Sequence, residues 1–223
     1  MRAVAATLRL AVGALLLIAP GCAHCPAVLD GLSRLVKEGL IGRLEVVNIA
    51  TRPDVAEAEA VRTVPWVRIG PYTLTGSHTP GELAEWAERA AQGSGLASYF
   101  AHLLETNRFE EAVALIRQSP GSLEDLIIML GDLETPMSVR IGIGAVVEEL
   151  ADADILGATV DALGALARSE HAQVRADACH YLGLTANPRA IPLLQSCVED
   201  ESHEVREIAS ESLALLHKDT VDG

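Results

Sequence analysis

The chain has 223 residues, of which 49% are apolar and only 3% aromatic, so it can bury a sizeable core built from aliphatic side chains. Its formal net charge is −14, which argues against nucleic acid or an anionic membrane as a partner. Residues 1–92 hold 9 basic and 9 acidic residues, whereas residues 93–223 hold 8 and 22. This asymmetry predicts two domains, residues 1–92 and 93–223, with different surfaces.

The first landmark is an uninterrupted apolar run over residues 10–19. It is too short to cross a membrane, which takes roughly 20 such residues, so no membrane span is expected. Two interpretations remain open. The run can be a buried parallel strand in a cytoplasmic protein. Alternatively, with Arg2 and Arg9 as its basic flank, residues 1–21 can act as a signal peptide, and the protein is then exported or periplasmic.

The remaining elements of residues 1–92 alternate between helix and strand. Pro26 suits the first turn of a helix, and Thr79 before Pro80 suits a helix cap. The segment 44–49 is rich in β-branched residues, as in a strand. We expect helices at 2–11, 23–38, 53–61 and 80–91, and strands at 14–19, 44–49, 66–69 and 72–75.

A Cys-x-x-Cys motif, Cys22-Ala23-His24-Cys25, follows the first predicted strand, and Thr63-Val64-Pro65-Trp66 and Gly76 come later in the chain. Together with the order β-α-β-α-β-β-α, these residues resemble the thioredoxin superfamily over residues 1–92. The resemblance implies an α/β thioredoxin-like fold with a cis-proline at Pro65 that faces the cysteine pair. It also implies a protein dithiol or disulfide as substrate, bound in strand-like pairing at Val64 and Pro65 with Gly76 nearby.

The motif predicts different roles for the two cysteines. Cys22 comes just before a helix, where free backbone N–H groups and the helix dipole favour the thiolate. Cys25, one turn in and buried, is expected to resolve the mixed disulfide. His24 can donate to the Cys22 thiolate, which makes the pair more oxidising. We therefore expect Cys22, Cys25 and His24 to be catalytic.

The sequence also departs from the thioredoxin pattern. Pro20-Gly21 stands where thioredoxins carry a tryptophan before the first cysteine, and the first strand holds no acidic residue. Three alternatives therefore stay open: half of a zinc site, a module without turnover that serves as an adaptor, and a redox sensor. No second Cys-x-x-Cys, metal-binding cluster or nucleotide-binding loop accompanies the pair, so we expect no metal and no cofactor.

Beyond a short linker at residues 92–95 the sequence is helical almost throughout. We expect helices at 96–105, 108–117, 122–131, 137–150, 153–168, 171–184, 188–199 and 203–217. A Val-Arg pair recurs within this region, at Arg140, Arg175 and Arg206, in similar surroundings. The repeat resembles HEAT-like repeats of the short kind found in bacterial proteins, including lyases that attach bilin pigments, and covers residues 137–217. It implies an all-α solenoid.

The residues of the solenoid suggest packing rather than chemistry. Cys179 and Cys197 are expected to be small core hydrophobes. Arg175 and Arg206 are expected to pair with acids such as Asp200. The acidic surface is either a solvated face or a docking surface for a protein partner. The leading hypothesis is a bacterial-type thiol–disulfide oxidoreductase whose HEAT-like domain binds a protein partner or substrate; the alternative is a non-enzymatic adaptor or redox sensor.

Overall fold

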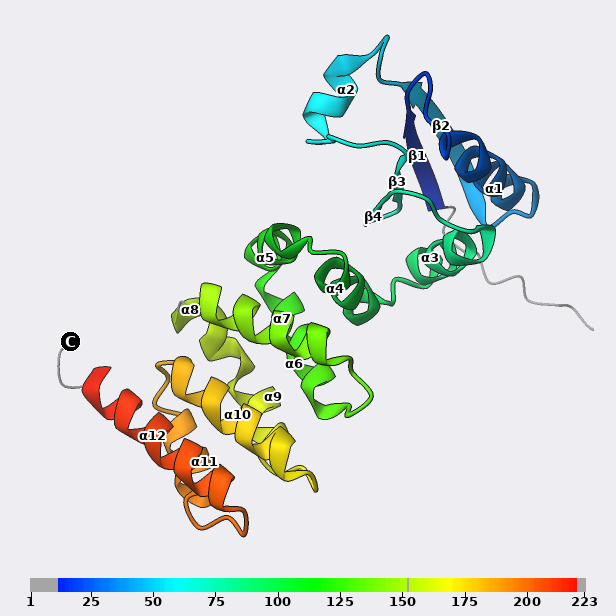
Figure 1. Cartoon of the computed structure of the whole chain (residues 1–223). Coiled ribbons are helices and arrows are strands. Elements are labelled where there is room, and N and C mark those ends of the chain that lie inside the picture. The colour runs from blue at the N-terminus through cyan, green and yellow to red at the C-terminus, as the bar shows by residue number, and fades with distance from the viewer. Residues whose placement is uncertain (1–11, 152, 220–223) are drawn as a thin grey trace, which may run out of the picture. The chain divides into compact units, whose positions relative to one another are not determined.

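The computed structural model describes residues 12–151 and 153–219. They form two compact units, with the boundary between Gly95 and Leu96 (Figure 1). The helix expected at residues 2–11 lies outside the described residues.

The N-terminal unit is built on a four-stranded mixed sheet in the order β2-β1-β3-β4. Strand β1 runs parallel to β2 and antiparallel to β3, and β3 and β4 form an antiparallel pair. The elements of this unit are β1 (Val12–Ile18), α1 (Cys25–Lys37), β2 (Ile41–Asn48), α2 (Pro53–Ala58), β3 (Trp66–Ile69), β4 (Tyr72–Thr75) and α3 (Pro80–Gln92).

The central strand β1 is buried on both faces, which explains its continuous apolar sequence. Leu15 and Leu17 pack with Trp66 on one face, where Val55 of α2 adds to the cluster. Because side chains alternate along a strand, Leu16 lies on the other face, and it is fully buried. Helices α1 and α3 contact each other and the sheet. The predicted strand at 14–19 is therefore correct in kind, and its bounds shift toward the N-terminus.

Two helices of this unit differ in extent from the prediction. Helix α1 begins at Cys25 rather than at residue 23, so Cys25 is the first helical residue and not one turn in. Helix α2 ends at Ala58 rather than at residue 61. It stops because Ala60 adopts a left-handed conformation, with φ of 53°, which cannot continue a right-handed helix. Strands β3 and β4 have the predicted bounds.

The C-terminal unit is entirely helical in its described part. Its helices are α4 (Leu96–Glu105), α5 (Phe109–Gln118), α6 (Leu123–Ile128), α7 (Met137–Glu149), α8 (Ala153–Leu156), α9 (Val160–Leu166), α10 (Ala172–Leu184), α11 (Ala190–Cys197) and α12 (His203–Asp219). The helices expected at 122–131 and 153–168 are both interrupted. Short 3-10 turns at Met129–Gly131 and Gly157–Thr159 end α6 and separate α8 from α9. Glycine weakens a helix at both places.

The recurring arginines hold successive helices together through backbone carbonyls and carboxylates. In α7, Arg140 donates to the carbonyl of Leu130 at 3.0 Å and to the carboxylate of Asp177 in α10 at 2.6 Å. In α10, Arg175 donates to the carbonyl of Ser169 at 2.9 Å and to both carboxylate oxygens of Asp200, at 2.8 and 2.9 Å. The expected pairing of Arg175 with Asp200 is confirmed.

The third arginine of the series uses Asp200 in another way. Arg206 of α12 donates to the backbone carbonyls of Asp200 at 2.7 Å and Glu201 at 3.0 Å. We expected Arg206 to pair with an acidic residue such as Asp200. The residue is correct, but Arg206 binds its backbone carbonyl and not its carboxylate. Asp200 binds α10 with its carboxylate and α12 with its carbonyl, while its side chain is only 12% exposed.

Replacing Asp200 by Asn should destabilise the C-terminal unit, because the buried Arg175 then keeps only the exposed carboxylate of Glu201, at 3.3 Å; the expected loss in free energy of unfolding is about 3 kcal/mol. Asp161→Asn is the matched control, since the Arg189–Asp161 pair is exposed and its loss should cost less than about 1 kcal/mol. Urea unfolding followed by helical circular dichroism gives both values. Equal losses would show that burial of the Asp200 pair contributes nothing.

The same pair predicts a pH dependence. The hydrogen bond from Arg175 holds the pKa of Asp200 below its ordinary value. The ion pair therefore stabilises the folded state fully at pH values above the ordinary pKa of an Asp, about 4. This stabilisation is lost as the pH falls through the lowered pKa of Asp200 in the folded protein. The difference in stability between the wild-type protein and Asp200→Asn should narrow below about pH 4.

Candidate functional site

A tight turn carries the chain from β1 to the first cysteine. The N–H of Cys22 donates to the carbonyl of Ala19 at 3.3 Å, and Gly21 has φ of 77°. Pro20 at the second position and a glycine with positive φ at the third are the pattern of a type II turn. The Pro20-Gly21 pair that departs from the thioredoxin sequence thus has a local structural role.

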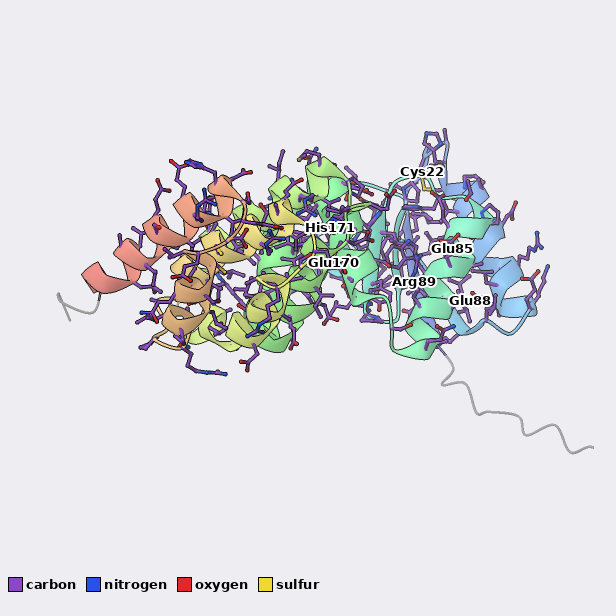
Figure 2. All side chains as sticks on the ribbon, turned by 90° about the horizontal axis from the view of Figure 1, so that it is seen from below. Cys22, Glu85, Glu88, Arg89, Glu170 and His171 are labelled. Atoms are coloured by element: carbon purple, nitrogen blue, oxygen red, sulfur yellow. A yellow bond between two sulfur atoms is a disulfide. The ribbon has the colours of Figure 1, made fainter. Side chains whose placement is uncertain are left out.

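The two cysteines of the motif are joined and differ in exposure. Cys22 and Cys25 form a disulfide (Figure 2). Cys25 is buried at 5% exposure, whereas Cys22 is half-buried. The sulfur of Cys22 accepts a hydrogen bond from the N–H of Cys25 at 3.2 Å. An incoming sulfur can therefore reach Cys22 more readily than Cys25.

Helix α1 provides a favourable field for negative charge at Cys22. Its 13 residues begin at Cys25, and no acidic residue occupies the first turn. The N–H groups of that turn and the helix dipole stabilise a thiolate placed before them. Once the pair is reduced, a thiolate at Cys22 is thus favoured electrostatically.

The sheet register brings a second predicted segment to the same edge. Strand β3 is antiparallel to β1, with Trp66 opposite Leu17, so Pro65 lies at the end of the sheet from which the turn to Cys22 starts. The Val64–Pro65 peptide bond is cis. The carbonyl of Pro65 accepts from the N–H of Gly76 at 2.9 Å, and this bond joins two of the residues expected at a substrate surface.

The backbone of Val64 differs from that of its neighbour. Within the described part of the chain no hydrogen bond is made to or from the main chain of Val64, and its side chain is half-buried. Pro65 has no N–H, and its carbonyl already serves Gly76. Strand-like pairing with another chain is therefore available at Val64 rather than at Pro65.

The side chain of His24 makes no hydrogen bond to either sulfur or to the start of α1 among the described contacts. His24 caps the N-terminus of α1 through its carbonyl, which accepts from Val28 at 3.4 Å, and its side chain is exposed. In the described structure the imidazole makes no hydrogen bond. The donor role expected of His24 toward Cys22 is therefore not seen in the disulfide-bonded pair.

A pocket near this edge had no sequence-based expectation. It has a volume of about 400 Å³ and is lined by Ile49, Pro53, Ala56, Glu57, Ala60, Val61 and Arg62. The N–H of Ile49 donates to the carbonyl of Ile18 at 2.9 Å, so the pocket adjoins the strand end that leads to Cys22. Ala60, which has a left-handed backbone conformation, is part of the lining. Neither the composition nor the periodicity of this segment predicts that conformation.

The other two cysteines are reduced and buried. Interaction with Cys197 in α11 and burial raise the pKa of the Cys179 thiol in α10. Both therefore behave as core residues. In the described part of the chain, no three His, Cys, Asp or Glu residues are grouped to hold a metal ion. Likewise, among the described residues no helix combines the length and apolar character needed to cross a membrane.

Comparison with known proteins identifies part of the helical unit. Residues 123–214 match the family model of HEAT repeats. The match begins at α6 and so extends the repeated region by one helix toward the N-terminus, compared with the predicted 137–217. No curated protein matches the chain significantly. HEAT repeats indicate protein–protein interaction as the role of this unit.

Gly21→Ala should destabilise the N-terminal unit by about 1 kcal/mol, because alanine is strained at a positive φ. No atom outside the neighbouring residues lies within 4 Å of the added Cβ, so conformation alone causes the loss. Gly81→Ala, in the first turn of α3, is the matched control and should be neutral or slightly stabilising. Unfolding followed by the fluorescence of Trp66 and Trp86 reports on this unit alone; equal stability of the two variants would contradict the prediction.

Proposed function

We propose that the protein is a thiol–disulfide oxidoreductase with a thioredoxin-like N-terminal unit, and that its HEAT repeats bind a protein partner or substrate. The single observation that carries the proposal is the Cys22–Cys25 disulfide at the start of α1, with Cys22 half-exposed and Cys25 buried. A structural disulfide needs no such difference in exposure, whereas exchange chemistry does.

The topology adds support for a thioredoxin-like unit. The mixed sheet with β1 between a parallel and an antiparallel neighbour, the Cys-x-x-Cys after β1 and the cis-proline before β3 are the features that the sequence resemblance implies. Their common edge leaves the Val64 backbone available to an extended substrate chain. The pocket that adjoins this edge offers room for a substrate side chain.

The chemistry follows from the difference in exposure. In the oxidising direction a substrate thiolate attacks the sulfur of Cys22; the Cys22–Cys25 bond breaks, and Cys25 leaves as a thiolate that takes up a proton. A second substrate thiolate then attacks the substrate sulfur of the mixed disulfide and releases Cys22 as a thiolate. The substrate dithiol loses two electrons and two protons and becomes a disulfide, and the cysteine pair is reduced.

The reducing direction uses the same groups in reverse order. The Cys22 thiolate attacks a substrate disulfide, and the thiol of Cys25 then loses its proton and displaces the substrate from Cys22. The N–H of Cys25 and the first turn of α1 stabilise the Cys22 thiolate in both directions. The balance between the directions depends on how far the protein stabilises that thiolate.

The experiment that tests the proposal separates the two cysteines. Oxidised glutathione added to reduced Cys25→Ser should give a mixed disulfide that persists on Cys22, because no resolving thiol is present. Cys22→Ser should give none within the same time, because Cys25 is buried. Mass spectrometry of the intact chain measures both. Cys197→Ala is the control for a buried thiol elsewhere and should behave as the wild type.

An activity assay with the same variants gives the result that would contradict the proposal. If Cys22→Ser and Cys25→Ser both keep full activity in insulin or glutathione exchange, the oxidoreductase proposal fails. The adaptor alternative, which the HEAT match favours, would then account for the protein. It predicts partner binding that survives replacement of both Cys22 and Cys25.

His24→Ala should make the pair less oxidising, since it removes a donor that stabilises the Cys22 thiolate of the reduced form. One charge-assisted hydrogen bond is worth about 1.5 kcal/mol, which corresponds to a potential lower by about 30 mV. Equilibration with glutathione buffers and mass-spectrometric readout gives both potentials. An unchanged or higher potential in the variant would assign His24 no part in thiolate stabilisation.

The wild-type potential in the same experiment decides the direction. A value near −270 mV, roughly that of thioredoxin, indicates a reductase. A value near −120 mV, roughly that of the strongest oxidants of this chemistry, indicates an oxidase or isomerase.

A further inference from the structure

The HEAT-repeat unit exposes an apolar patch on α7 and the loop before it. The patch comprises Leu133, Met137 and Ile141, which are 48%, 63% and 67% exposed. Met137 and Ile141 are one helical turn apart and therefore adjoin on the surface of α7. Leu133 and Met137 line a common pocket of about 340 Å³, a size that accepts one large apolar side chain.

Another helix of the repeat shows that large apolar residues are not needed at these positions in every repeat. Aligned on their Val-Arg pairs, Met137 and Ile141 of α7 correspond to His203 and Glu207 of α12. There the two positions are occupied by polar side chains, with His203 Nδ1 3.7 Å from Glu207 Oε2, and both are well exposed. Helix α12 thus carries polar groups at these positions, whereas α10 has Ala172 and Ala176 there, of which Ala176 is buried. In α7 both positions are exposed, so their apolar residues do not serve core packing.

The surroundings of the patch are acidic. Asp132 and Glu134, on either side of Leu133, are both exposed, and Glu134 lines the pocket. The one cation of the pocket lining, Arg140, is only 8% exposed and is held by the carboxylate of Asp177. Residues 93–223 also carry the whole net charge of −14. The field at the patch therefore favours a positively charged partner.

We propose that the patch of Leu133, Met137 and Ile141 binds a protein segment that presents a large apolar side chain flanked by Lys or Arg. This inference rests on the proposed partner-binding role of the HEAT repeats and gives it a surface and a ligand class. The apolar side chain fills the pocket, and the basic flanks pair with Asp132 and Glu134. A redox reaction is not part of the binding step.

Synthetic peptides test the proposal with the full chain. The probe is a fluorescent 12-residue peptide without cysteine, in which a central Leu has two Lys on each side; two reference peptides replace the Lys by Glu or the Leu by Ser. Fluorescence anisotropy should give a dissociation constant for the probe at least about tenfold lower than for either reference. Added salt should weaken binding of the probe.

Variants assign the binding to the patch. Met137→Glu and Ile141→Glu should each weaken probe binding at least about tenfold. Leu215→Glu is the matched control, because Leu215 on α12 is exposed to the same degree as Leu133 and lies outside the patch; it should bind as the wild type. Thermal unfolding of each variant establishes that the fold is retained.

Three results would overturn the inference: equal affinity for the Lys- and Glu-flanked peptides, unchanged binding by Met137→Glu, or equal loss in Leu215→Glu. Sedimentation that reveals a dimer of the wild type, dissolved by Met137→Glu, would assign the patch to a second copy of this chain instead. Replacement of both Cys22 and Cys25 by Ser should leave probe binding intact, so failure of the redox proposal and failure of this inference are separate outcomes.

Discussion

The N-terminal unit depends on the pairing of β1 with two partners of opposite direction. Parallel pairing with β2 puts the carboxyl ends of both strands at one edge of the sheet, and antiparallel pairing with β3 brings the start of β3 to that same edge. Segments distant in the chain, the turn to Cys22 and the loop that ends at Pro65, therefore share one edge. A shift of β3 by one residue would turn Trp66 away from Leu15 and Leu17, so burial of that cluster holds the register and, with it, the site.

The helical unit solves a different problem, which is the coupling of helices that each bury only one face. The stacked apolar side chains supply most of the stabilisation, and the hydrogen bonds of the buried arginines fix how neighbouring helices align. Arg140 and Arg175 each bind a backbone carbonyl N-terminal to their own helix and a carboxylate that comes later in the chain. Such bonds cannot form if the helices slide by one turn, so they specify the stacking in addition to stabilising it.

Most elements of the structure could be predicted from the sequence because their causes are local. The turn residues and alternation around β3 and β4 fix these strands within a few positions, and the Val-Arg repeat identifies the array. The thioredoxin-like identity and the catalytic roles remain proposals. What the sequence could not give depends on particular backbone conformations. Ala60 ends α2 early without a glycine or proline to announce it, and the pocket beside it went unseen for that reason.

The patch on α7 was missed for a related reason. Met137 and Ile141 fit the apolar stripe of an ordinary buried helix, and only the three-dimensional packing shows which side of α7 faces solvent. The pattern at Cys22 has the opposite character, because two cysteines three residues apart at a helix start are informative without any structure. The place of the cysteine pair at a helix start was thus predictable from local sequence, whereas surfaces made by the packing of several helices were not.

The double use of Asp200 has a mechanical consequence. Its carboxylate holds Arg175 of α10 and its carbonyl holds Arg206 of α12, so relative sliding of these two helices strains both bonds at one residue. Each repeat of a solenoid contacts only its neighbours, and the α10–α12 interface is held by two bonds at one residue, whereas Arg140 links α7 to α10 by one carboxylate. When a load bends the array, the α10–α12 interface should therefore resist sliding more than an interface that lacks such bonds.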